Sequence, residues 1–374
     1  MRVVIVSPSL DAGGPTNVIY NMLEAYVKGH YKFEISLICL SDARSNSRQS
    51  DFEKLGIKVM NLYIPKGYKG IFYASRLKKA ILCESPNIVH VHGFVPEMLL
   101  SMINLPNVKK ITSQFNFPFE DYVMLYGKIL GKLMSQVSML MYRHFDMVIP
   151  CSQYIINRIK DVKKDVPYKY RVIYTGVPTD KFSPLDREGK IAARKRLGLP
   201  IEKKIFLYIA VFIKRKNPKI LLRAFSELKQ EDCLLLMMGA GELVNGCKQI
   251  CDDPNVVKSL GKQNSTLEYL QVSDYLVSAS YSEGFPTAVL EAMSVGVAPI
   301  LSAIGPHIEM LSGVSTPMLF NADDKETLKS IISQPDSSID YREYFYHNFS
   351  STVMIEKHYE LYKELLNIDN NSFK

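Results

Sequence analysis

Short apolar runs, many of them rich in β-branched residues, alternate with longer amphipathic stretches along the chain. In the first half, the stretches at 13–30, 73–85 and 120–145 have the periodicity of helices. The runs around them predict strands: RVVIVS, FEISLICL, IKVMNLYI, NIVHVHG, KKITSQF and DMVIPCS. Strands that alternate with helices favour a parallel sheet covered by helices on both faces. We therefore expect a doubly wound α/β domain in this half.

The same alternation begins again near residue 204. Strands are predicted by KIFLYIAVF, CLLLMMGAG, VVKSLG, DYLVSAS and APILS, and helices by 217–230, STLEYLQVS and TAVLEAMSVG. The stretch 165–186, rich in proline and turn residues, is the expected junction. A last helix near 350–366 carries one apolar stripe, made of Ile355, Tyr359, Tyr362 and Leu366. Two doubly wound domains that face each other across a cleft would bind ligands at the carboxyl ends of their strands.

The segment SEGFPTAVLEAMSVG, at 282–296, places one carboxylate on each side of a predicted helix start. Pro286 suits a first helical turn, and Gly296 suits the helix end. Backbone amides at this start, together with the helix dipole, favour an anion. Glu283 and Glu291 could then hold a sugar and a ribose on either side of a diphosphate, the order found in a nucleotide sugar. On spacing alone an equal alternative stays open, in which Glu291 serves its own helix start and Glu283 is a solvated loop residue.

Two further groups lie at predicted strand ends in the second half. Lys214, Arg215 and Lys216 stand between a strand and a helix, where they could neutralise a diphosphate, although a charge run is usually a solvated face. Gly239 and Gly241 end another strand and would leave room for a planar base. A single G-x-G is weak support for this function.

The charge is uneven along the 374 residues. Residues 1–170 contain 22 Lys and Arg against 13 Asp and Glu, which indicates a surface that meets phosphate or anionic lipid, or else a lysine-rich solvated face. Within this half, 126–145 reads as a basic amphipathic helix that could dock on an anionic membrane. The commoner outcome is that its apolar stripe packs on the first sheet. That stripe consists of Ile129, Leu133, Val137, Leu140 and Met141.

Other patterns argue against several classes of protein. The six cysteines form no C-x-x-C pair, so we expect buried, reduced thiols in a cytoplasmic protein. The first residues begin a strand at once rather than a signal peptide, and no apolar stretch approaches the roughly 18 residues of a membrane span. His90 and His92 share a strand face, but the sequence offers no third ligand, so we expect no metal site.

Several segments, in this order, resemble one family: the GG at 13–14, NIVHVHG, VIYTGVPTDKF, KRKNP with LLRAF, GAGEL, and SEGFPTAVLEAMSVGVAP. The family is the retaining glycosyltransferases of the GT-B fold (glycosyltransferase family 4, group 1), in which seven residues separate two glutamates. The resemblance spans nearly the whole chain. It implies an acceptor-binding Rossmann-like domain at 1–168, with the helix near 350–366 packing back on it. It also implies a nucleotide-sugar-binding Rossmann-like domain at 169–349.

The resemblance implies roles for individual residues. Glu291 matches the glutamate that binds the ribose, and Glu283 matches the one beside the transferred sugar. Lys216 matches the lysine on the diphosphate, and His92 matches a histidine near the reacting sugar. The implied catalytic residues are Glu283 and His92, and the implied donor-binding residues are Gly13, Gly14, Lys214, Arg215, Lys216, Gly239, Gly241, Glu242, Gly284, Phe285, Pro286, Thr287 and Glu291.

Three positions depart from the family pattern. Val211 stands where an arginine is usual, so Arg215 or Lys214 would have to supply the second positive charge on the diphosphate. Thr175 replaces an asparagine, and Asn87 replaces an acid that often precedes the first histidine of its strand.

The resemblance implies a metal-independent transferase, and the sequence contains no D-x-D tripeptide. It needs no cofactor beyond the nucleotide-diphosphate sugar that serves as co-substrate. The expected partners are this donor, a glycan or lipid-linked acceptor, and an anionic membrane in peripheral contact, but no nucleic acid. Synthesis of a bacterial capsule, O-antigen or exopolysaccharide would suit such a protein. The alternatives are a catalytically degenerate member that acts as a binding partner, and a nucleotide-sugar epimerase. An NAD-dependent enzyme is disfavoured because the GG at 13–14 lacks the G-x-G-x-x-G pattern.

Overall fold

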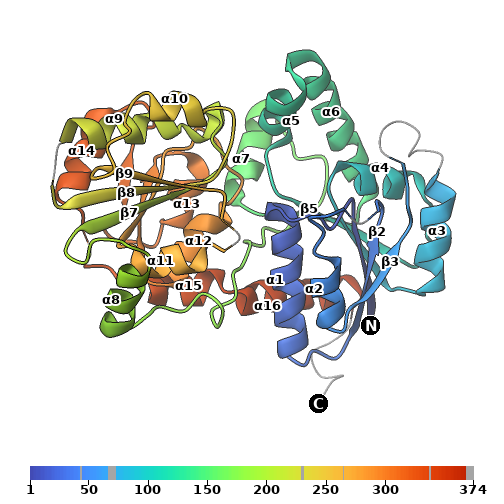
Figure 1. The fold of residues 1–374 in the computed structure, drawn as a ribbon. Helices are drawn as coiled ribbons and strands as arrows, with labels where there is room; N and C mark the ends of the chain where they lie inside the picture. The colour runs from blue at the N-terminus through green and yellow to red at the C-terminus, as the bar shows by residue number, and fades with distance from the viewer. Residues whose placement is uncertain (43, 66–72, 229–230, 264, 337, 368–374) are drawn as a thin grey trace. The chain divides into compact units, whose positions relative to one another are not determined.

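The computed structural model describes residues 1–42, 44–65, 73–228, 231–263, 265–336 and 338–367. The chain forms two compact units (Figure 1). Unit 1 comprises Met1–Gly176 and the segment from Ser351 onward, and unit 2 comprises Val177–Ser350. The division therefore falls after Gly176, within the predicted junction at 165–186, rather than after residue 168.

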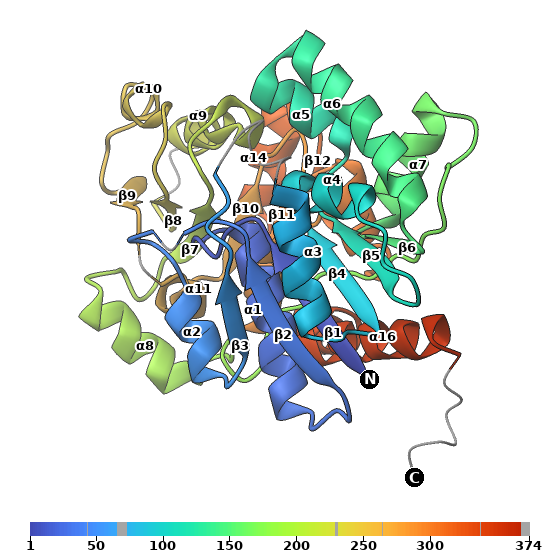
Figure 2. The ribbon, with the colours of Figure 1, turned by 90° about the vertical axis from the view of Figure 1, so that its right-hand side faces the viewer.

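Unit 1 contains a parallel sheet of six strands in the order β3-β2-β1-β4-β5-β6 (Figure 2). The strands β2 and β3 lie on one side of β1, and β4, β5 and β6 lie on the other, so the direction in which the chain adds strands reverses between β1 and β4. At this reversal point, Ile5 of β1 pairs with His90 of β4. All five residues of β4 are buried, including His90 and His92, so this strand lies in the interior of the unit. The strands are β1 (Arg2–Ser7), β2 (Glu34–Cys39), β3 (Lys58–Asn61), β4 (Ile88–His92), β5 (Lys109–Gln114) and β6 (Met147–Pro150).

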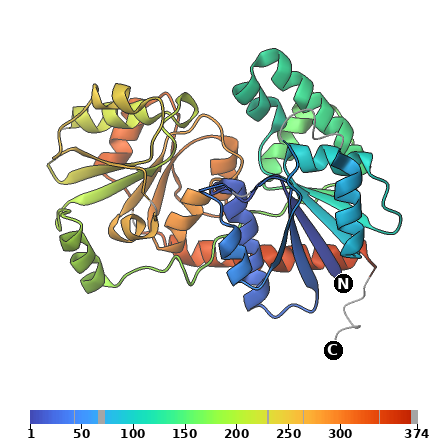
Figure 3. The same cartoon turned by 45° about the vertical axis from the view of Figure 1, so that its right-hand side comes forward.

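Helices cover this sheet, and one of them comes from the far end of the chain. Helix α16 (Ser351–Leu365) packs against α1 (Gly14–Lys28), with Ile355 and Tyr362 fully buried in the core of unit 1 (Figure 3). The pattern of apolar residues predicted α1, α3 (Ala74–Cys83) and α16, but it missed α2 (Gln49–Lys54), α4 (Phe94–Met102) and α7 (Gln153–Val162).

The long helix predicted at 120–145 is wrong as one element. It is divided into α5 (Pro118–Tyr126) and α6 (Lys128–Met141), with the short 3₁₀ turn η2 (Tyr142–His144) after them. Gly127 has a φ of +81°, a left-handed conformation that ends α5 and lets the chain turn back. A Cβ on Gly131 would lie 2.4 Å from the carbonyl oxygen of Tyr122, so glycine allows the two helices to pack closely.

Unit 2 repeats the architecture with a parallel sheet in the order β12-β11-β10-β7-β8-β9. The order of addition reverses between β7 and β10. Its strands are β7 (Lys204–Ile209), β8 (Cys233–Met238), β9 (Val257–Gly261), β10 (Tyr275–Ser278), β11 (Ala298–Ser302) and β12 (Met318–Phe320). Its helices are α8 (Arg187–Arg196), α9 (Pro218–Leu228), α10 (Val244–Lys248), α11 (Leu267–Val272), α12 (Thr287–Ser294), α13 (Gly305–Met310), α14 (Lys325–Ser333) and α15 (Tyr341–Phe349), with the 3₁₀ turn η3 (Lys214–Lys216) after β7. The last two residues of the helix predicted at 217–230 lie outside the described residues.

Two expectations from the composition, for the cysteines and for membrane spans, can be compared with the structure. Four of the six cysteine thiols are buried, but Cys83 is exposed and Cys251 is half-buried, so the prediction that the thiols are buried is wrong for these two. Within the described residues, no helix combines the length and the apolar character that crossing a membrane requires.

Candidate active site

The two glutamates of the segment at 282–296 lie at the carboxyl edge of the second sheet, beside its reversal point. Strand β10 ends at Ser278, and the chain passes through Glu283 before α12 begins at Thr287. Pro286 occupies the N-cap position, one residue earlier than a first-turn proline. Gly296, with a φ of +79°, donates to the carbonyl of Met293 and closes the helix as predicted.

Glu283 is enclosed by two cations and a hydroxyl. Its carboxylate forms ion pairs with Lys216 and, at 3.4 Å, with Arg215. Ser280 Oγ donates a hydrogen bond to Oε1 at 2.6 Å. Burial of the side chain, which is only 8% exposed, would raise the pKa of Glu283. The charge and hydrogen bond of Lys216, with Ser280 and Arg215, outweigh that effect, so the pKa lies below its ordinary value. The carboxyl group is therefore ionised at neutral pH, and it is not a solvated loop residue.

Two hydrogen bonds, one between backbone groups and one from a side chain, fix the loop of Glu283 to the turn that carries the cations. The amide of Tyr281 donates to the carbonyl of Arg215 at 2.8 Å, and Arg215 Nη1 donates to the carbonyl of Ser282 at 2.7 Å. Asn217 has a φ of +47°, a conformation that asparagine tolerates, and it ends the turn just before α9. The ends of β7 and β10 are thus joined into one charged site.

The structure distinguishes the three cations of the basic run. Arg215 and Lys216 both contact Glu283, whereas the side chain of Lys214 is exposed. Val211, where the family usually has an arginine, is 55% exposed. Of the two residues considered as the second cation, Arg215 is therefore the one that lies beside Lys216.

Glu291, in the second turn of α12, has a different environment. Its Oε2 accepts a hydrogen bond from Thr266 Oγ1 at 3.1 Å. The residue keeps some accessible surface, but protein surrounds the carboxyl group, and this burial raises the pKa of Glu291 to about 7, against the opposing effects of Thr266 and Lys181. A carboxyl group with this pKa can accept or donate a hydrogen bond near neutral pH, which suits a partner made of hydroxyl groups.

Gly239 and Gly241 have a structural reason to be glycine. Both have a positive φ, +141° and +155°. A Cβ on Gly239 would lie 1.9 Å from the carbonyl oxygen of Ala210, and one on Gly241 would lie 2.6 Å from that of Phe212. The glycines therefore let the chain after β8 pack against the chain after β7. The neighbouring Glu242 is exposed. That these glycines leave room for a planar base stays a prediction.

Sequence reasoning missed His307, near the start of α13. The ring is fully buried, and Nδ1 contacts the carbonyl oxygen of Ser302 at 2.8 Å, while Nε2 has no hydrogen-bond partner among the described residues. Burial lowers the pKa of His307 to about 4, although the nearby Glu283 acts in the opposite direction. The signal in the sequence was a G-P-H turn directly after a predicted strand, the place where such sheets bind ligands.

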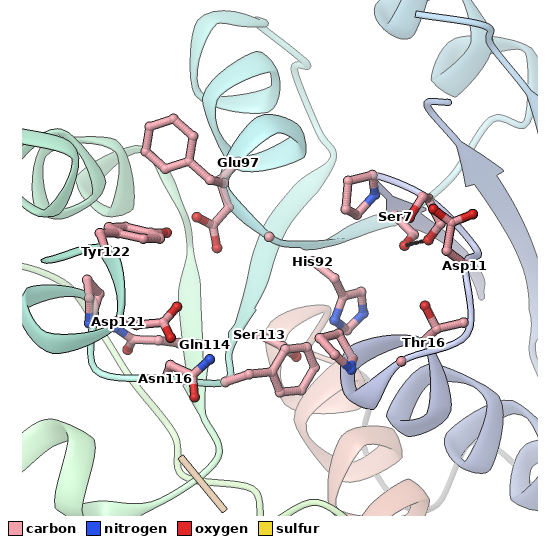
Figure 4. Close-up of a pocket in the computed structure, with 18 of the residues that line it drawn as sticks. Ser7, Asp11, Thr16, His92, Glu97, Ser113, Gln114, Asn116, Asp121 and Tyr122 are labelled. Carbon is pink, nitrogen blue, oxygen red and sulfur yellow. Dashed lines mark hydrogen bonds between the residues drawn. The ribbon is translucent and has the colours of Figure 1, made fainter. Parts of the chain in front are cut away.

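Unit 1 has a cavity of about 390 Å³ at the reversal point of its own sheet (Figure 4). Loops that follow β1, β4 and β5 meet there with α4, α5 and the start of α1. Gly13 lines this cavity, and Gly14 begins α1 beside it with open space where a Cβ would be. Of the implied catalytic pair, His92 lines this cavity, and Glu283 belongs to unit 2.

His92 is almost fully buried in the floor of this cavity. Its ring stacks on Phe115 and lies 4.4 Å, between centroids, from the ring of His90. Neither ring nitrogen of His92 has a hydrogen-bond partner among the described residues. Burial, followed by the charge of His358, lowers the pKa of His92 to about 3, so the ring is neutral at physiological pH. The described residues contain no group of three or more His, Cys, Asp or Glu side chains placed to hold a metal ion.

The folds of the two units and the charged site at β7 and β10 define the class of the protein, a two-domain GT-B glycosyltransferase. The family model described as Glycosyltransferase Family 4 matches residues 12–181, and the one described as Glycosyl transferases group 1 matches residues 189–346. The chain belongs to this family of glycosyltransferases.

Individual proteins show the same likeness. The chain is 28% identical over 295 residues to the UDP-Gal:alpha-D-GlcNAc-diphosphoundecaprenol alpha-1,3-galactosyltransferase of Escherichia coli, covering 73% of this chain and 72% of that protein. It is 25% identical to the capsular polysaccharide biosynthesis glycosyltransferase CapH of Staphylococcus aureus, covering 68% and 69%. Among solved structures, Anabaena HepE in complex with UDP and glucose has a TM-score of 0.79 at 15% identity, covering 97% of this chain and 100% of that one. This last likeness concerns the fold.

Proposed function

We propose that the protein is a metal-independent, retaining glycosyltransferase that moves a sugar from a nucleotide-diphosphate donor to a glycan or lipid-linked saccharide acceptor. In this proposal unit 2 holds the donor and unit 1 holds the acceptor. The observation that carries it is the contact of Glu283 with Lys216 and Arg215 at the reversal point of the second sheet. Glu291, which is separated from Glu283 by seven residues, supplies a second carboxyl group from within α12.

The charges explain how such a site would act on the donor. When the bond from the anomeric carbon to the diphosphate breaks, the leaving group gathers negative charge and the sugar ring becomes positive. Lys216 and Arg215 stabilise that negative charge more in the transition state than in the ground state. The ionised Glu283 keeps both cations in place and accepts hydrogen bonds from the sugar hydroxyls. Glu291 binds the ribose hydroxyls.

Retention of configuration follows if the acceptor attacks from the face that the diphosphate leaves. The leaving phosphate can take the proton of the acceptor hydroxyl, so the protein needs no separate base. The neutral ring of His92 suits a position near the reacting sugar, because an uncharged imidazole can exchange hydrogen bonds with hydroxyl groups.

The names of two relatives support a role in bacterial surface polysaccharide synthesis, such as a capsule, O-antigen or exopolysaccharide. One relative is named for an acceptor carried on diphosphoundecaprenol, and another for capsular polysaccharide biosynthesis. A lipid-linked acceptor would place the protein in the cytoplasm, in peripheral contact with the membrane.

A surface of unit 1 supports this membrane contact. The end of α5 and the start of α6 expose six apolar side chains, which we call the α5–α6 corner: Met124, Leu125, Tyr126, Ile129, Leu130 and Leu133. Ile129 is 89% exposed, and the exposed Lys128 and Lys132 lie on the same two turns. Apolar side chains with adjacent lysines suit the headgroup layer of an anionic membrane. Of the apolar stripe predicted for this segment, Met141 is buried and Val137 is half-buried, so only its other members are exposed.

The test of the proposed activity is transfer itself. Purified full-length protein is incubated with a panel of UDP-, GDP- and dTDP-sugars and polyprenyl-diphosphate saccharides, with and without EDTA. We expect release of one nucleoside diphosphate, unchanged by EDTA, and a product whose anomeric configuration by NMR equals that of the donor. Binding of nucleotides without release under any condition would favour the degenerate binding partner. A changed sugar still attached to its nucleotide would favour the epimerase.

A further inference from the structure

The cavity of unit 1 is lined by buried polar atoms that lack partners. Glu97 is 1% exposed and Gln114 is 3% exposed. Neither Oε2 of Glu97 nor either amide atom of Gln114 has a hydrogen-bond partner among the described residues. Buried polar groups are nearly always hydrogen-bonded in native proteins, so such a group in a cavity points to a ligand or to water.

The orientation of these two side chains is fixed. Thr112 Oγ1 donates to Glu97 Oε1 at 2.7 Å, which holds the carboxyl group at the wall of the cavity. Thr112 and Gln114 are two residues apart on β5, so they share one face of the strand. Figure 4 shows Glu97 reaching from α4 into the space that Gln114 and Tyr122 also border. The hydroxyl of Tyr142 lies near the carboxyl group of Glu97 and counters the rise of its pKa, so Gln114 is the residue whose two polar side-chain atoms both lack a partner among the described residues.

The remainder of the lining suits a sugar rather than a phosphate. Phe94, Phe115 and Tyr122 line the cavity and offer flat apolar faces on which the C–H groups of a sugar ring can lie. Among the described residues that line it, none is lysine or arginine. Two carboxyl groups line it instead: that of Asp11, which forms an ion pair with Arg44 at 3.5 Å, and that of Asp121, whose negative charge would repel a phosphate. Burial raises the pKa of Glu97 to about 7, so that group carries only part of a negative charge at neutral pH and can also donate a hydrogen bond.

We propose that Glu97 and Gln114 determine acceptor specificity, by hydrogen-bonding the hydroxyl or amide groups of an uncharged sugar ring that lies against the aromatic wall of the cavity. The terminal sugar of the acceptor then binds here, and any phosphate of the acceptor lies outside. The statement that this sugar belongs to the acceptor rests on the proposed function, but the binding of a neutral sugar can be measured without transfer. Both residues are positioning residues, because they hold the acceptor and do not touch the donor's reacting bond.

Binding is tested on the full-length protein by saturation-transfer NMR. The probes are the methyl α-glycosides of glucose, galactose and N-acetylglucosamine, each paired with the matching α-glycosyl 1-phosphate. We expect wild-type protein to bind at least one neutral glycoside, and to bind its 1-phosphate no more tightly, because a phosphate would lie outside the cavity. Glu97→Leu and Gln114→Leu should each weaken the neutral glycoside at least tenfold. Glu97→Gln, which keeps the shape and a hydrogen-bonding group, should stay within about threefold.

The controls separate this inference from loss of fold and from the donor site. Glu34→Leu makes the same change as Glu97→Leu at an exposed carboxylate of unit 1 and should leave glycoside binding unchanged. Circular dichroism checks that each variant folds, and Gln114→Leu tests the proposal if Glu97→Leu does not. UDP binding, measured in parallel, reports on the donor site alone. Glycoside binding that survives both leucine variants, preference for the 1-phosphates, or no binding of any glycoside to wild type would overturn the proposal, the last by showing that the unpartnered atoms hold water only.

Discussion

Lys216 and Glu283, which are 67 residues apart in the chain, form an ion pair at the point where the second sheet reverses its order of strands. One residue follows β7 and the other follows β10, two neighbouring parallel strands whose carboxyl ends meet. The pair therefore exists because the sheet places these strand ends together. A negative side chain that holds two cations is also a site at which a diphosphate can compete for them.

We expect the basic run to act unequally in turnover. Lys216→Met and Arg215→Met should each lower kcat/KM for the donor by more than tenfold, about 1.4 kcal/mol of barrier, because both cations are partly desolvated beside Glu283. Lys214→Met is the matched control, and it should stay within about twofold because that side chain is exposed. The measurement is nucleoside diphosphate release under steady-state conditions. A larger loss in Lys214→Met than in the other two variants would contradict the assignment.

The two glutamates should separate binding from turnover. Glu291→Ala should weaken donor binding about tenfold or more, because the ribose would lose hydrogen bonds to a buried carboxyl group. Glu283→Ala should abolish turnover while the protein stays folded. Calorimetry with the nucleoside diphosphate measures the first effect, and product formation measures the second. Wild-type transfer rates in both variants would show that the site has been placed wrongly.

Glu97 should make the protein less stable at alkaline pH. Its folded-state pKa is raised, mainly by burial, from 4.5 to about 7, so the folded protein binds more protons than the unfolded chain between these values. The free energy of unfolding then falls as pH rises through this window, by roughly 3 kcal/mol in total. Glu97→Gln removes the ionisation and should be more stable than wild type at pH 8, by up to that amount, and nearly equal at pH 5.

Urea denaturation of wild type and Glu97→Gln at both pH values checks this. The buried histidines, such as His307 with a pKa lowered to about 4, act in the opposite direction, since their stability is lost as pH falls below about 6.5. They are present in both proteins, so the difference between the two isolates Glu97. Equal differences at pH 5 and pH 8 would mean that Glu97 does not titrate in this window.

Two glycines should differ in how much stability the protein loses when each is replaced by alanine. Gly239→Ala should cost more than about 2 kcal/mol of stability, because the Cβ would overlap the carbonyl oxygen of Ala210 and φ is +141°. Gly14→Ala should change stability by less than about 1 kcal/mol, since its Cβ would meet open space. Thermal unfolding of both variants provides the comparison. If Gly239→Ala were as stable as wild type, the glycine would have to be explained by a ligand instead.

The α5–α6 corner predicts salt-sensitive binding to membranes. Full-length protein should sediment with vesicles that contain anionic lipid, little with neutral ones, and less as salt rises, because lysine contacts are screened. The double variant Ile129→Gln, Leu133→Gln should lower the bound fraction severalfold. Met102→Gln changes an apolar residue elsewhere in unit 1 that is about as exposed as Leu133, and it is the control. Absence of sedimentation with every vesicle would favour a soluble acceptor.

The sequence by itself predicted the larger part of the fold, and the reason is local. Strands such as β1 and β8 are buried on both faces, so each reads as an apolar run, and the amphipathic α1 and α16 show helical periodicity. The short helices α2, α10 and α13 were missed because five or six residues carry too little periodicity. The break at Gly127 was missed because the apolar pattern continues through it, and only the close packing of α5 on α6 requires the turn.

The candidate site, like the fold, was predicted from the sequence only in part. Glu283, Glu291 and the basic run were found because they lie in short segments with a recognisable spacing. That Arg215 rather than Lys214 accompanies Lys216 was decided by the tertiary structure, since η3 is anchored to the loop after β10. The cavity with Glu97 and Gln114 was also beyond the sequence, because it joins strand ends and helices far apart along the chain. The chemical groups of a short segment can be recognised from neighbouring residues. The burial of a side chain and the absence of a hydrogen-bond partner arise only when distant segments pack together.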